Sequence, residues 1–581
     1  MKRATTRRLL VLLSTAVIAL AVALPAAAAK PEGPPGQTVG VQLLAFNDYH
    51  GHLEATTPGT ALDMPAGGAA YLATHLKQLS QGAQHTLTVA AGDLIGGSPF
   101  LSGLFHDEPS VESLNAMGLD VSSVGNHEFD EGVTELLRMQ NGGCHPVDGC
   151  YFPKEPYEGA DFPWLAANVV NDETGDTVLP PYWITTVENV KIGFIGMTLE
   201  ATPTLVAQAG IEGWSFLDEA ETANALVPEL KAQGVEAIVV LIHEGANPSD
   251  IADLNSCIGV SGPIVGIQSR LDPEIDAIIT GHTHQPYNCV FADPDGDPRH
   301  VTSAYSFGRV ISEVNLPIDK GSGEVIREQV TAENHIVTQD VRRDRNVMKV
   351  IEKWAPLAEE VGSVPVGEAT APITRATTAS GSEDRGAESD LGNLIADAQL
   401  WATQPNGAVL ALMNPGGIRA DLDAGVITYA EAFNVQPFSN ILMTIPMTGA
   451  QIQSVLEEQC QPIGASRPFL HLGVSEGLTY DLSRTIEQVP DPDDPGEMIA
   501  GCTAITVSNV MLNGAALDPS ATYTVTINNF LADGGDNFTT FREIDPALRI
   551  GGGIDLDEFV NYLTEFSPVS PPGTDRVNEI P

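Results

Sequence analysis

Basic residues are scarce in this chain. Its 581 residues include 28 lysines and arginines against 76 aspartates and glutamates, which gives a formal net charge of −48 at pH 7. Long-range attraction to the phosphates of a nucleic acid duplex depends on an excess of positive charge. The composition therefore argues against a duplex-binding protein. Small anionic ligands can still bind, because local cations and metal ions decide affinity at short range.

Low-complexity tracts and short repeats are also lacking, and 43% of the residues are hydrophobic, as in ordinary globular proteins. A chain of this length is too long for a single hydrophobic core. We therefore expect two domains with appendages.

One long apolar run, Leu9 to Leu24, lies near the N-terminus. It follows a basic start and precedes the small residues Ala26 to Ala29, which is the pattern of a cleaved signal peptide over residues 1–29. No cysteine stands at that junction to accept a lipid, and no apolar segment closes the C-terminus. We expect an exported, extracellular protein without a membrane anchor after cleavage. The pattern does not indicate an oligomeric state.

Cysteine is limited to six residues, and their spacing matches no zinc motif. Because an exported chain meets an oxidising compartment, disulfides are expected. Fifteen pairings are open, and free buried thiols are the alternative. Neighbours along the chain suggest three sequential bridges, which would join Cys144 to Cys150, Cys257 to Cys289, and Cys460 to Cys502.

Five short polar clusters each follow an apolar run rich in branched residues. Such runs are typical of buried strands in a sheet covered on both faces, and ligand sites lie at the ends of such strands. The runs are Val41 to Phe46, Thr86 to Ala91, Val121 to Val124, Ala237 to Ile242, and Ala277 to Thr280. The clusters are Asp48-Tyr49-His50, Gly92-Asp93, Gly125-Asn126-His127-Glu128, His243-Glu244, and Gly281-His282-Thr283-His284.

These clusters combine carboxylate, imidazole and amide side chains. Hydrolysis of a phosphate ester needs a strong nucleophile and neutralisation of charge, which two cations about 3.5–4 Å apart provide. Mixed nitrogen and oxygen ligands suit Zn, Mn, Fe or Co, and one carboxylate can be shared. A lone His or Asp at a strand end is more often a turn or cap residue. Five clusters in order instead predict a two-metal phosphoesterase site.

The succession N-D-x-H-G-H, G-D-x-x-x-G-S, G-N-H-E-F-D, H-E-G and G-H-T-H resembles the calcineurin-like metallophosphoesterase superfamily. Within it, the order of the motifs is similar to the secreted bacterial 5′-nucleotidase and UDP-sugar hydrolase family. The resemblance implies an α/β chain with an N-terminal four-layer α/β/β/α metallophosphoesterase domain, a linker helix and a C-terminal α/β substrate-binding domain. It also implies two divalent metal ions as cofactors, Zn, Mn or similar.

The resemblance assigns roles to individual residues. One metal would be held by Asp48, His50 and His284, the other by Asn126, His243 and His282, with Asp93 shared between them. His127 would stabilise the phosphoryl oxygens and assist the leaving group, while Asp130 fixes its tautomer. His52, Glu54 and Glu128 are equally compatible with supporting roles and with solvated loop positions.

Four later motifs are similar to the substrate-binding C-terminal domain of the same family. They are Leu391-Gly392-Asn393, Asn414-Pro415-Gly416-Gly417-Ile418-Arg419, Gln436-Pro437-Phe438-Ser439-Asn440 and Asn529-Phe530-Leu531-Ala532-Asp533-Gly534-Gly535-Asp536. Phe438 and Phe530 are candidates to enclose a nucleobase, with stacking worth about 1–3 kcal/mol per base. An isolated phenylalanine in such a motif is more often a core residue.

Polar residues of these motifs suit the rest of a nucleotide. Asn440 would bond the base edge, and Asp536 would accept from ribose hydroxyls. Arg419 and Arg385 would grip the phosphate or ribose end, since guanidinium groups suit bidentate oxyanion contacts. Asn414 would support that pocket, and Arg375 is a rival to Arg385.

The patterns divide the chain into segments. We expect the first domain over 38–340, an amphipathic linker helix over 341–362, the second domain over 363–545 and an extension over 546–581, whose tail after Pro568 is loosely ordered. Local patterns of the second domain predict a helix at Leu391 to Thr403, a strand at Ala408 to Met413, a helix capped by Thr448 and a strand at Tyr523 to Ile527.

The function expected from these features is a secreted 5′-nucleotidase that releases nucleoside and phosphate without a covalent phosphoenzyme. The same site could hydrolyse UDP-sugars or dinucleotides, or act as a 2′,3′-cyclic nucleotide phosphodiesterase and 3′-nucleotidase. An alternative of another class is a secreted nucleotide-binding protein without catalysis, for which a full ligand set would be surplus. The resemblance further implies closure of the two domains about the linker helix.

Overall fold

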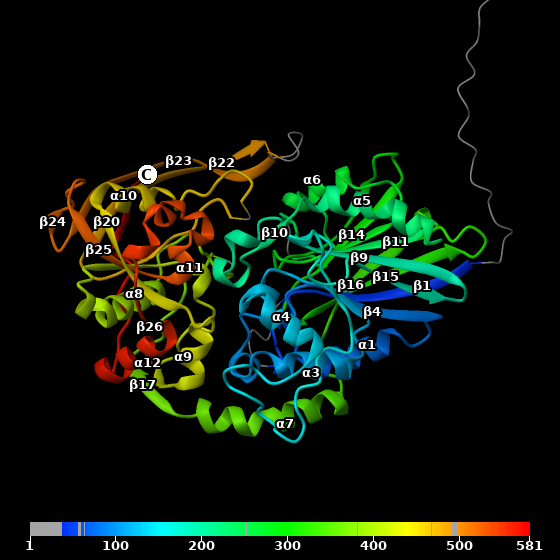
Figure 1. The fold of residues 1–581 in the computed structure, drawn as a ribbon, viewed down its shortest axis with the longest axis horizontal. Helices are drawn as coiled ribbons and strands as arrows, with labels where there is room; N and C mark the ends of the chain where they lie inside the picture. Colours follow the sequence, from blue (N-terminus) through cyan, green and yellow to red (C-terminus); the bar gives the residue numbers. More distant parts are fainter. Residues whose placement is uncertain are drawn as a thin grey trace, which may run out of the picture.

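The computed structural model describes residues 38–55, 60–62, 64–249, 252–379, 381–465, 467–490, 492 and 498–580. The expected signal peptide, residues 1–29, lies outside these ranges. The described chain forms two α/β regions that lie side by side, the first coloured blue to green and the second yellow to red in Figure 1. A long helix, α7, runs along both.

The first region contains two mixed six-stranded sheets. In the first sheet the order is β16-β15-β1-β4-β5-β6. The central strands β1, β4 and β5 pair in parallel, so the polar residues that follow them lie at one edge. The strands are β1 Thr38–Phe46, β4 His85–Ala91, β5 Val121–Ser123, β6 Trp164–Leu165, β15 Val310–Asp319 and β16 Thr331–Ile336.

The second sheet has the order β13-β14-β12-β11-β9-β8. Strands β9, β11, β12 and β14 run parallel, which brings the residues after β11 and β12 together. The strands are β8 Tyr182–Val187, β9 Val190–Thr198, β11 Ala237–His243, β12 Ala277–Thr280, β13 Pro286–Ala292 and β14 Pro298–Ala304. The five apolar runs of the sequence are thus strands of these two sheets.

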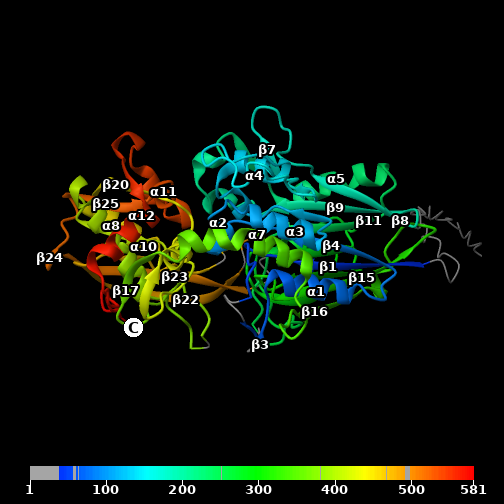
Figure 2. The ribbon, with the colours of Figure 1, turned by 90° about the horizontal axis from the view of Figure 1, so that it is seen from below.

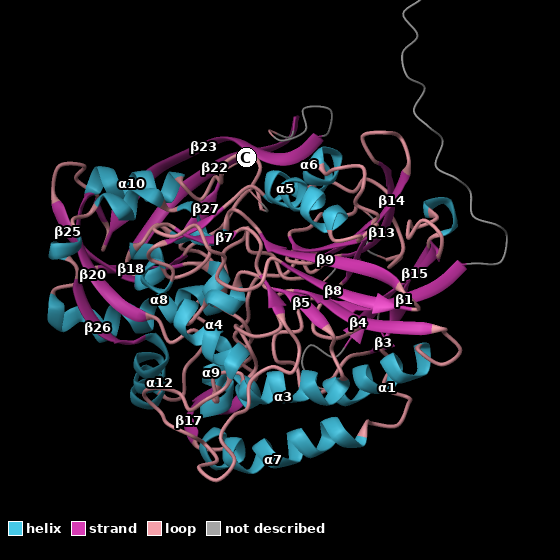
Figure 3. Cartoon of the chain, turned by 45° about the vertical axis from the view of Figure 1, so that its right-hand side comes forward, coloured by secondary structure: helices cyan, strands magenta, loops and turns pink. Residues whose placement is uncertain are grey.

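Helices cover the outer face of each sheet. Branched and aromatic side chains such as Leu43, Phe194 and Leu241 fill the space between the sheets. Helices α1 Ala69–Leu79, α3 Glu108–Met117 and α4 Gly132–Asn141 share a buried cluster with the first sheet. Helices α5 Glu219–Ala232 and α6 Pro263–Arg270 pack on the second. Figure 3 shows the layers in profile. The expected α/β/β/α order is confirmed.

Helix α7, Arg345–Gly362, links the two regions (Figure 2). The side chain of Asp344 caps it by accepting from the backbone N–H groups of Asn346 and Val347. Trp354 is fully buried, and its Nε1 donates to Glu112 Oε2 at 2.9 Å. The linker is therefore a helix, as expected, and it is anchored on α3 of the first region.

The second region is built on a five-stranded sheet with the order β21-β18-β25-β20-β26. Its strands are β18 Leu410–Met413, β20 Ile441–Thr448, β21 Gly473–Val474, β25 Thr522–Asn528 and β26 Ile550–Ile554. Helices α8 Asp390–Thr403 and α10 Gly449–Glu457 accompany it. Thr448 caps α10, and its side chain and that of Gln451 bond each other's backbone N–H. The elements expected from local patterns are confirmed to within two residues.

A four-stranded sheet, β24-β23-β22-β27, extends the second region. Its main part is a long hairpin of β22 Leu478–Pro490 and β23 Met498–Leu512, with β24 Ala515–Ala516 and β27 Val577–Glu579. Smaller elements complete the chain: β2 Thr60–Ala61, β3 Met64–Pro65, β7 Val169–Asn171, β10 Trp214–Phe216, β17 Pro365–Ala369, β19 Gly425–Thr428, α2 Phe100–Gly103, α9 Tyr429–Val435 and α11 Asn529–Ala532.

Residues beyond 546 are integrated into the second region. Strand β26 pairs with β20, β27 pairs with β22, and helix α12 Asp555–Phe566 buries Phe559 and Leu563. The expectation of a loosely ordered tail is wrong for residues 568–580, because β27 and the bridge between Ala369 and Val569 hold that segment in place. The domain limits themselves stay predictions.

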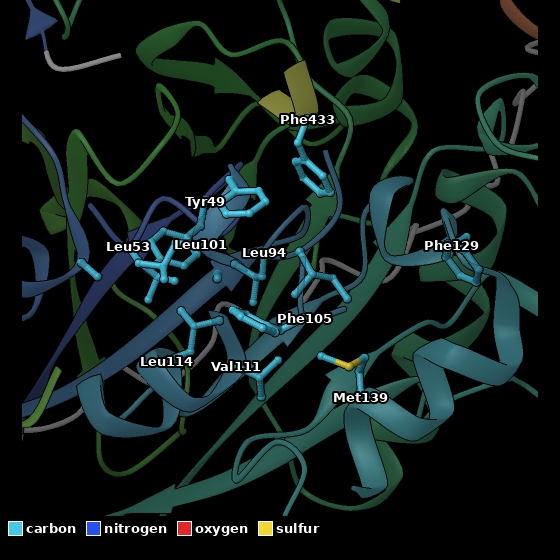
Figure 4. Packing of buried hydrophobic residues seen from close by; sticks show 14 of the residues in the cluster. Tyr49, Leu53, Leu94, Leu101, Phe105, Val111, Leu114, Phe129, Met139 and Phe433 are labelled. Carbon is cyan, nitrogen blue, oxygen red and sulfur yellow. The ribbon is translucent and has the colours of Figure 1, made fainter. Parts of the chain in front are cut away.

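An apolar contact zone joins α2 of the first region to α9 of the second. Phe100 at the start of α2 packs edge-on against Phe433 of α9, with ring centroids 5.3 Å apart. The N–H of Phe100 donates to Asn434 Oδ1 at 2.8 Å. Phe433 therefore belongs to the same buried cluster as Leu94 and other residues of the first region, drawn in Figure 4.

Three disulfides join Cys144 to Cys150, Cys257 to Cys289, and Cys460 to Cys502. The sequential pairing is confirmed. None of the described helices is both long and apolar enough to cross a bilayer.

Candidate active site

A cleft of about 1720 Å³ separates the two regions. Residues of both regions line it, and they include most of the candidate site residues. On the side of the first region the lining includes Asp93, Asn126, His127, Asp130, His282 and His284; on the side of the second it includes Arg385, Asn414, Arg419, Phe438, Asn440, Phe530 and Asp536.

Asp48, His50 and His284 meet at the floor of the cleft. His284 Nε2 lies 3.1 Å from Asp48 Oδ1 and 3.2 Å from His50 Nε2. His50 Nδ1 lies 2.8 Å from the carbonyl oxygen of Gly96, to which it donates, so its Nε2 carries a lone pair. One ligand atom from each of the three residues can reach a common ion.

Asp93, His243, His282 and Asn126 form a second group. His243 Nδ1 donates to the carbonyl oxygen of Ala91 at 2.7 Å, which leaves the Nε2 lone pair 2.9 Å from Asp93 Oδ2. His282 Nδ1 lies 3.1 Å from Asn126 Oδ1. Asp93 Oδ2 also lies 3.6 Å from His50 Nε2, so this carboxylate stands between the two groups.

The donor atoms fit a pair of divalent cations. Asp48 Oδ1 and His243 Nε2 are buried, and within the described chain neither has a hydrogen-bond partner. Buried polar atoms without partners are costly, and a lone pair that faces a carboxylate is repelled unless a positive charge lies between them. Carboxylate, imidazole and amide oxygen are donors that suit Zn or Mn.

The protonation preferences point the same way. Burial, with the charge of His243, lowers the pKa of His282 to about 3, so this imidazole is neutral. Burial also acts to lower the pKa of His243, but Asp93 and Asp48 raise it to about 10. The carboxylates therefore favour a positive charge at His243 Nε2, which a proton supplies when no metal ion is bound there.

Backbone conformation holds these side chains in place. Five of the candidate metal ligands have backbone φ between 46° and 70°, a region that residues other than glycine rarely adopt. Each such residue costs about 1–3 kcal/mol and persists only where the surroundings enforce it. The five are Asp48, His50, Asp93, His282 and His284.

Glu128 ties two of the loops together. Its carboxylate accepts from the backbone N–H groups of Asp93 at 2.9 Å, Leu94 at 2.7 Å and Gly125 at 2.5 Å. The loops approach so closely that a Cβ on Gly125 would clash with Asp93 Oδ1. Glu128 therefore fixes Asp93, a role that its motif position alone did not distinguish from that of a loop residue.

His127 and Asp130 form a hydrogen-bonded pair beside the two groups. His127 Nδ1 lies 2.8 Å from Asp130 Oδ2, and its backbone N–H donates to Asp93 Oδ1. Burial acts to lower the pKa of His127, but the carboxylates of Asp130 and Asp93 raise it above its usual value. The imidazole is thus suited to carry a proton toward the cleft.

Phe438 reaches across the cleft from the second region. Its ring stacks on His127 with centroids 5.8 Å apart and planes 17° from parallel, and the Arg419 guanidinium lies 5.8 Å from its centroid. Burial, followed by the charge of Arg385, lowers the pKa of Arg419 to about 10. Phe530 lines the same cleft and presses on Gly535. The structure thus brings both phenylalanines to one cleft.

A hydrogen-bonded network of side chains lies where the second region borders the cleft. Asn528 Nδ2 donates to Asn414 Oδ1, and Asn414 Nδ2 donates to Asp536 Oδ2, both at 3.0 Å. Asp536 has φ 53°, which turns its carboxyl toward the cleft-lining asparagine. Arg385 Nε lies 3.3 Å from Glu383 Oε2, in reach of the electrostatic field of Asp536.

Two candidates have competing partners. Arg375, the rival of Arg385, donates from Nε to Asp421 Oδ1 at 3.0 Å. Arg385 instead lies near Gly416 and Asp536, deeper in the pocket. The Asn440 amide donates from Nδ2 to Asp555 Oδ2 at 3.2 Å, so its Oδ1 is the group that remains available to a ligand.

Arg467 also lines the cleft, but it belongs to no sequence motif that would have identified it. The neighbouring positive charge of Arg385 lowers its pKa to about 10, and Glu383 and Asp536 oppose that effect. Its loop is closed by Gln461 N–H donating to the carbonyl oxygen of Pro468. Guanidinium groups of the second region therefore border the cleft at four positions: Arg375, Arg385, Arg419 and Arg467.

Two family models match the chain. A model described as calcineurin-like phosphoesterase covers residues 41–286, and one described as 5′-nucleotidase, C-terminal domain, covers residues 365–543.

Relatives and solved structures agree with these matches. A cell wall protein of Listeria monocytogenes is 34% identical over 91% of this chain and 67% of its own length. An endonuclease of Bacillus subtilis, YhcR, is 33% identical over 92% of this chain, but the chain spans only 40% of that protein. The crystal structure of a 5′-nucleotidase precursor from Thermus thermophilus is 26% identical, covers 93% of this chain and 99% of that chain, and has a TM-score of 0.72.

Proposed function

Because the chain belongs to the family that joins a calcineurin-like phosphoesterase domain to a 5′-nucleotidase C-terminal domain, we propose that it is a metal-dependent phosphohydrolase of nucleotides. The preferred reaction is removal of the 5′-phosphate to give nucleoside and phosphate. The observation that carries the proposal is the cleft itself, where a dimetal ligand set faces an aromatic and guanidinium set.

In this proposal Asp48, His50 and His284 hold one divalent ion, and Asn126, His243 and His282 hold the other. Asp93 bridges them. When bound, such a pair supplies a nucleophile near neutral pH and neutralises charge on the phosphoryl group. The contacts that support this assignment are the facing lone pairs and the two buried atoms without partners. Zn or Mn fits the donors.

His127 is the proposed acid and charge-stabilising group. With Asp130 on Nδ1, the proton on Nε2 can be directed to a phosphoryl or leaving-group oxygen. The raised pKa keeps that proton available. Asp130 thus acts through His127 rather than on the substrate.

The second region is the proposed nucleotide holder. Phe438 and Phe530 would stack on the base, Asn440 would bond its edge and Asp536 would accept from the ribose. Arg385 and Arg419 would grip the phosphate or ribose end, supported by Asn414. These side chains approach the metal ligands across one cleft, which supports a bound nucleotide that spans both regions.

Export to the extracellular space is also part of the proposal. The three disulfides are consistent with an oxidising compartment, and one relative is named as a cell wall protein.

Product formation tests the function: phosphate from AMP and p-nitrophenyl phosphate, UMP and glucose 1-phosphate from UDP-glucose, and an adenosine monophosphate from 2′,3′-cyclic AMP. The purified protein is assayed with AMP, UDP-glucose, 2′,3′-cyclic AMP and p-nitrophenyl phosphate, with Mn²⁺ or Zn²⁺ and with chelator. We expect metal-dependent product formation with the highest kcat/KM for AMP. Preference for UDP-glucose or the cyclic nucleotide would keep the dimetal site and change the substrate. Absence of metal-dependent product formation from all four would contradict the proposal.

A further inference from the structure

A further cluster of histidine and glutamate side chains, of the types that bind metals, lies away from the cleft. It consists of His106, Glu131, Glu135 and His145, none of which lines the cleft. His106 follows α2, Glu131 and Glu135 lie at the start of α4, and His145 stands in the loop closed by the Cys144 to Cys150 disulfide. Three separate segments therefore meet here.

The donor atoms converge closely. One ring nitrogen from each histidine and one oxygen from each glutamate all lie within 4.8 Å of one another. The two imidazole rings stack, with centroids 3.7 Å apart and planes 19° from parallel, so one ring has to turn before both can bind the same ion. His106 Nδ1 lies 2.8 Å from Glu131 Oε2 and 3.0 Å from Oε1. His106 has φ 49°, so its backbone is held in the left-handed region to place this ring.

A surrounding layer of contacts orients the donors. His106 Nε2 lies 2.8 Å from Asp148 Oδ2, so the ring can donate there while Nδ1 faces the group. Histidines that bind metal usually give their other N–H to a carboxylate in this way. The Asp148 N–H donates to His145 Nδ1 at 3.2 Å, so the neutral ring carries its proton on Nε2, and a shift of that proton to Nδ1 would free Nε2 for the ion. Glu135 is buried, and Arg138 donates to both of its carboxylate oxygens, so the ion would share this carboxylate with the guanidinium.

We propose that His106, Glu131, Glu135 and His145 bind one divalent transition metal ion, of the Zn²⁺ class, outside the catalytic pair. Two imidazoles and two carboxylates neutralise a dication and match the donors of four-coordinate zinc sites. The ion would join the turn after α2, the start of α4 and the disulfide loop. Its role would be structural, since these residues lie outside the cleft.

The alternative is a proton in place of the metal. A protonated His106 between Glu131 and Asp148 would be an ion pair stacked on His145, with no role for a cation. The two cases differ in metal content, which does not depend on whether AMP is hydrolysed. The test therefore stands apart from the proposed function.

Metal content per chain separates the two cases. The full chain is stripped with chelator, loaded with Zn²⁺, freed of excess ion and measured by mass spectrometry of the metal. We expect three equivalents in the wild type and two in His106→Gln/His145→Gln. The matched control is His85→Gln/His335→Gln, which removes two histidines that each pair with a single glutamate at 2.9 Å, and it should keep three.

A second measurement, of the Tm, is decisive even if the His106→Gln/His145→Gln variant folds poorly. In Asp93→Asn/His243→Ala, which disables the proposed catalytic pair, Zn²⁺ should still raise the Tm, because an ion that binds only the folded state stabilises it. Addition of the single change His145→Gln should abolish that rise. Equal zinc content in the wild type and the His106→Gln/His145→Gln variant, or an unchanged Tm shift with His145→Gln, would overturn the proposal.

Discussion

The two walls of the cleft are built differently. On the first wall the candidate ligands follow buried parallel strands, and strained backbone fixes most of them. On the second wall, Phe438, Phe530 and the arginines stand on loops and short helices and are partly exposed to the cleft. The first wall thus presents donors already in place for chemistry. The second presents groups that can adapt to a ligand. Substitutions in the first wall should therefore change mainly kcat or metal affinity, and substitutions in the second should change mainly nucleotide binding.

The largest effect is expected from the first wall. His127→Ala should lower kcat roughly 10²–10⁴-fold on every substrate, because it removes a proton donor and a charge-stabilising group. Steady-state kinetics with AMP and p-nitrophenyl phosphate measure it, and His75→Ala, outside the cleft, is the control. A wild-type rate would remove His127 from the mechanism.

The next effect should come from the second wall alone. Phe530→Ala should lower kcat/KM for AMP roughly 5- to 150-fold, the equivalent of about 1–3 kcal/mol of base stacking. The rate with p-nitrophenyl phosphate should change little, since that substrate has no base. Phe566→Ala, an exposed phenylalanine on α12, is the control. Equal losses of kcat/KM with both substrates would contradict a role of Phe530 in base stacking.

Glu128→Gln tests the rigidity of the first wall. The amide nitrogen would face backbone N–H groups that now donate to a carboxylate, so Asp93 should lose its fixed position. We expect metal affinity roughly 10–100-fold weaker, as for other supporting residues of metal sites, with KM for AMP at saturating metal little changed. Metal titration measures this, with Glu173→Gln, exposed in a turn outside the cleft, as the control. Unchanged metal affinity would show that the position of Asp93 does not depend on the Glu128 carboxylate.

Arg467→Gln should have the smallest effect. We expect KM for AMP to rise about tenfold, the low end for one hydrogen bond to a charged group, with kcat unchanged. Arg343→Gln, exposed and outside the cleft, is the control. A fall in kcat with constant KM would place Arg467 with the chemistry rather than with recognition.

Sequence patterns predicted the first wall better than the second. Branched apolar runs identify buried strands, and parallel pairing then forces residues such as Asp48 and Asp93 together. No such rule places Arg467, whose loop is positioned by backbone bonds between residues 459–461 and 468–470. The stack of Phe438 on His127 joins two regions, and it therefore depends on tertiary packing. The tail after Pro568 was misjudged because its pairing partner, β22, lies far away in the sequence.

The three disulfides each close a loop within one region, over sequence separations of 6, 32 and 42 residues. If the chain is exported as proposed, both cysteines of each pair reach the oxidising side close together in time. Each bridge can therefore form before the rest of the chain has crossed the membrane. No bridge joins the two regions, so their relative position depends on the α7 linker and on noncovalent contacts such as that of Phe100 with Phe433.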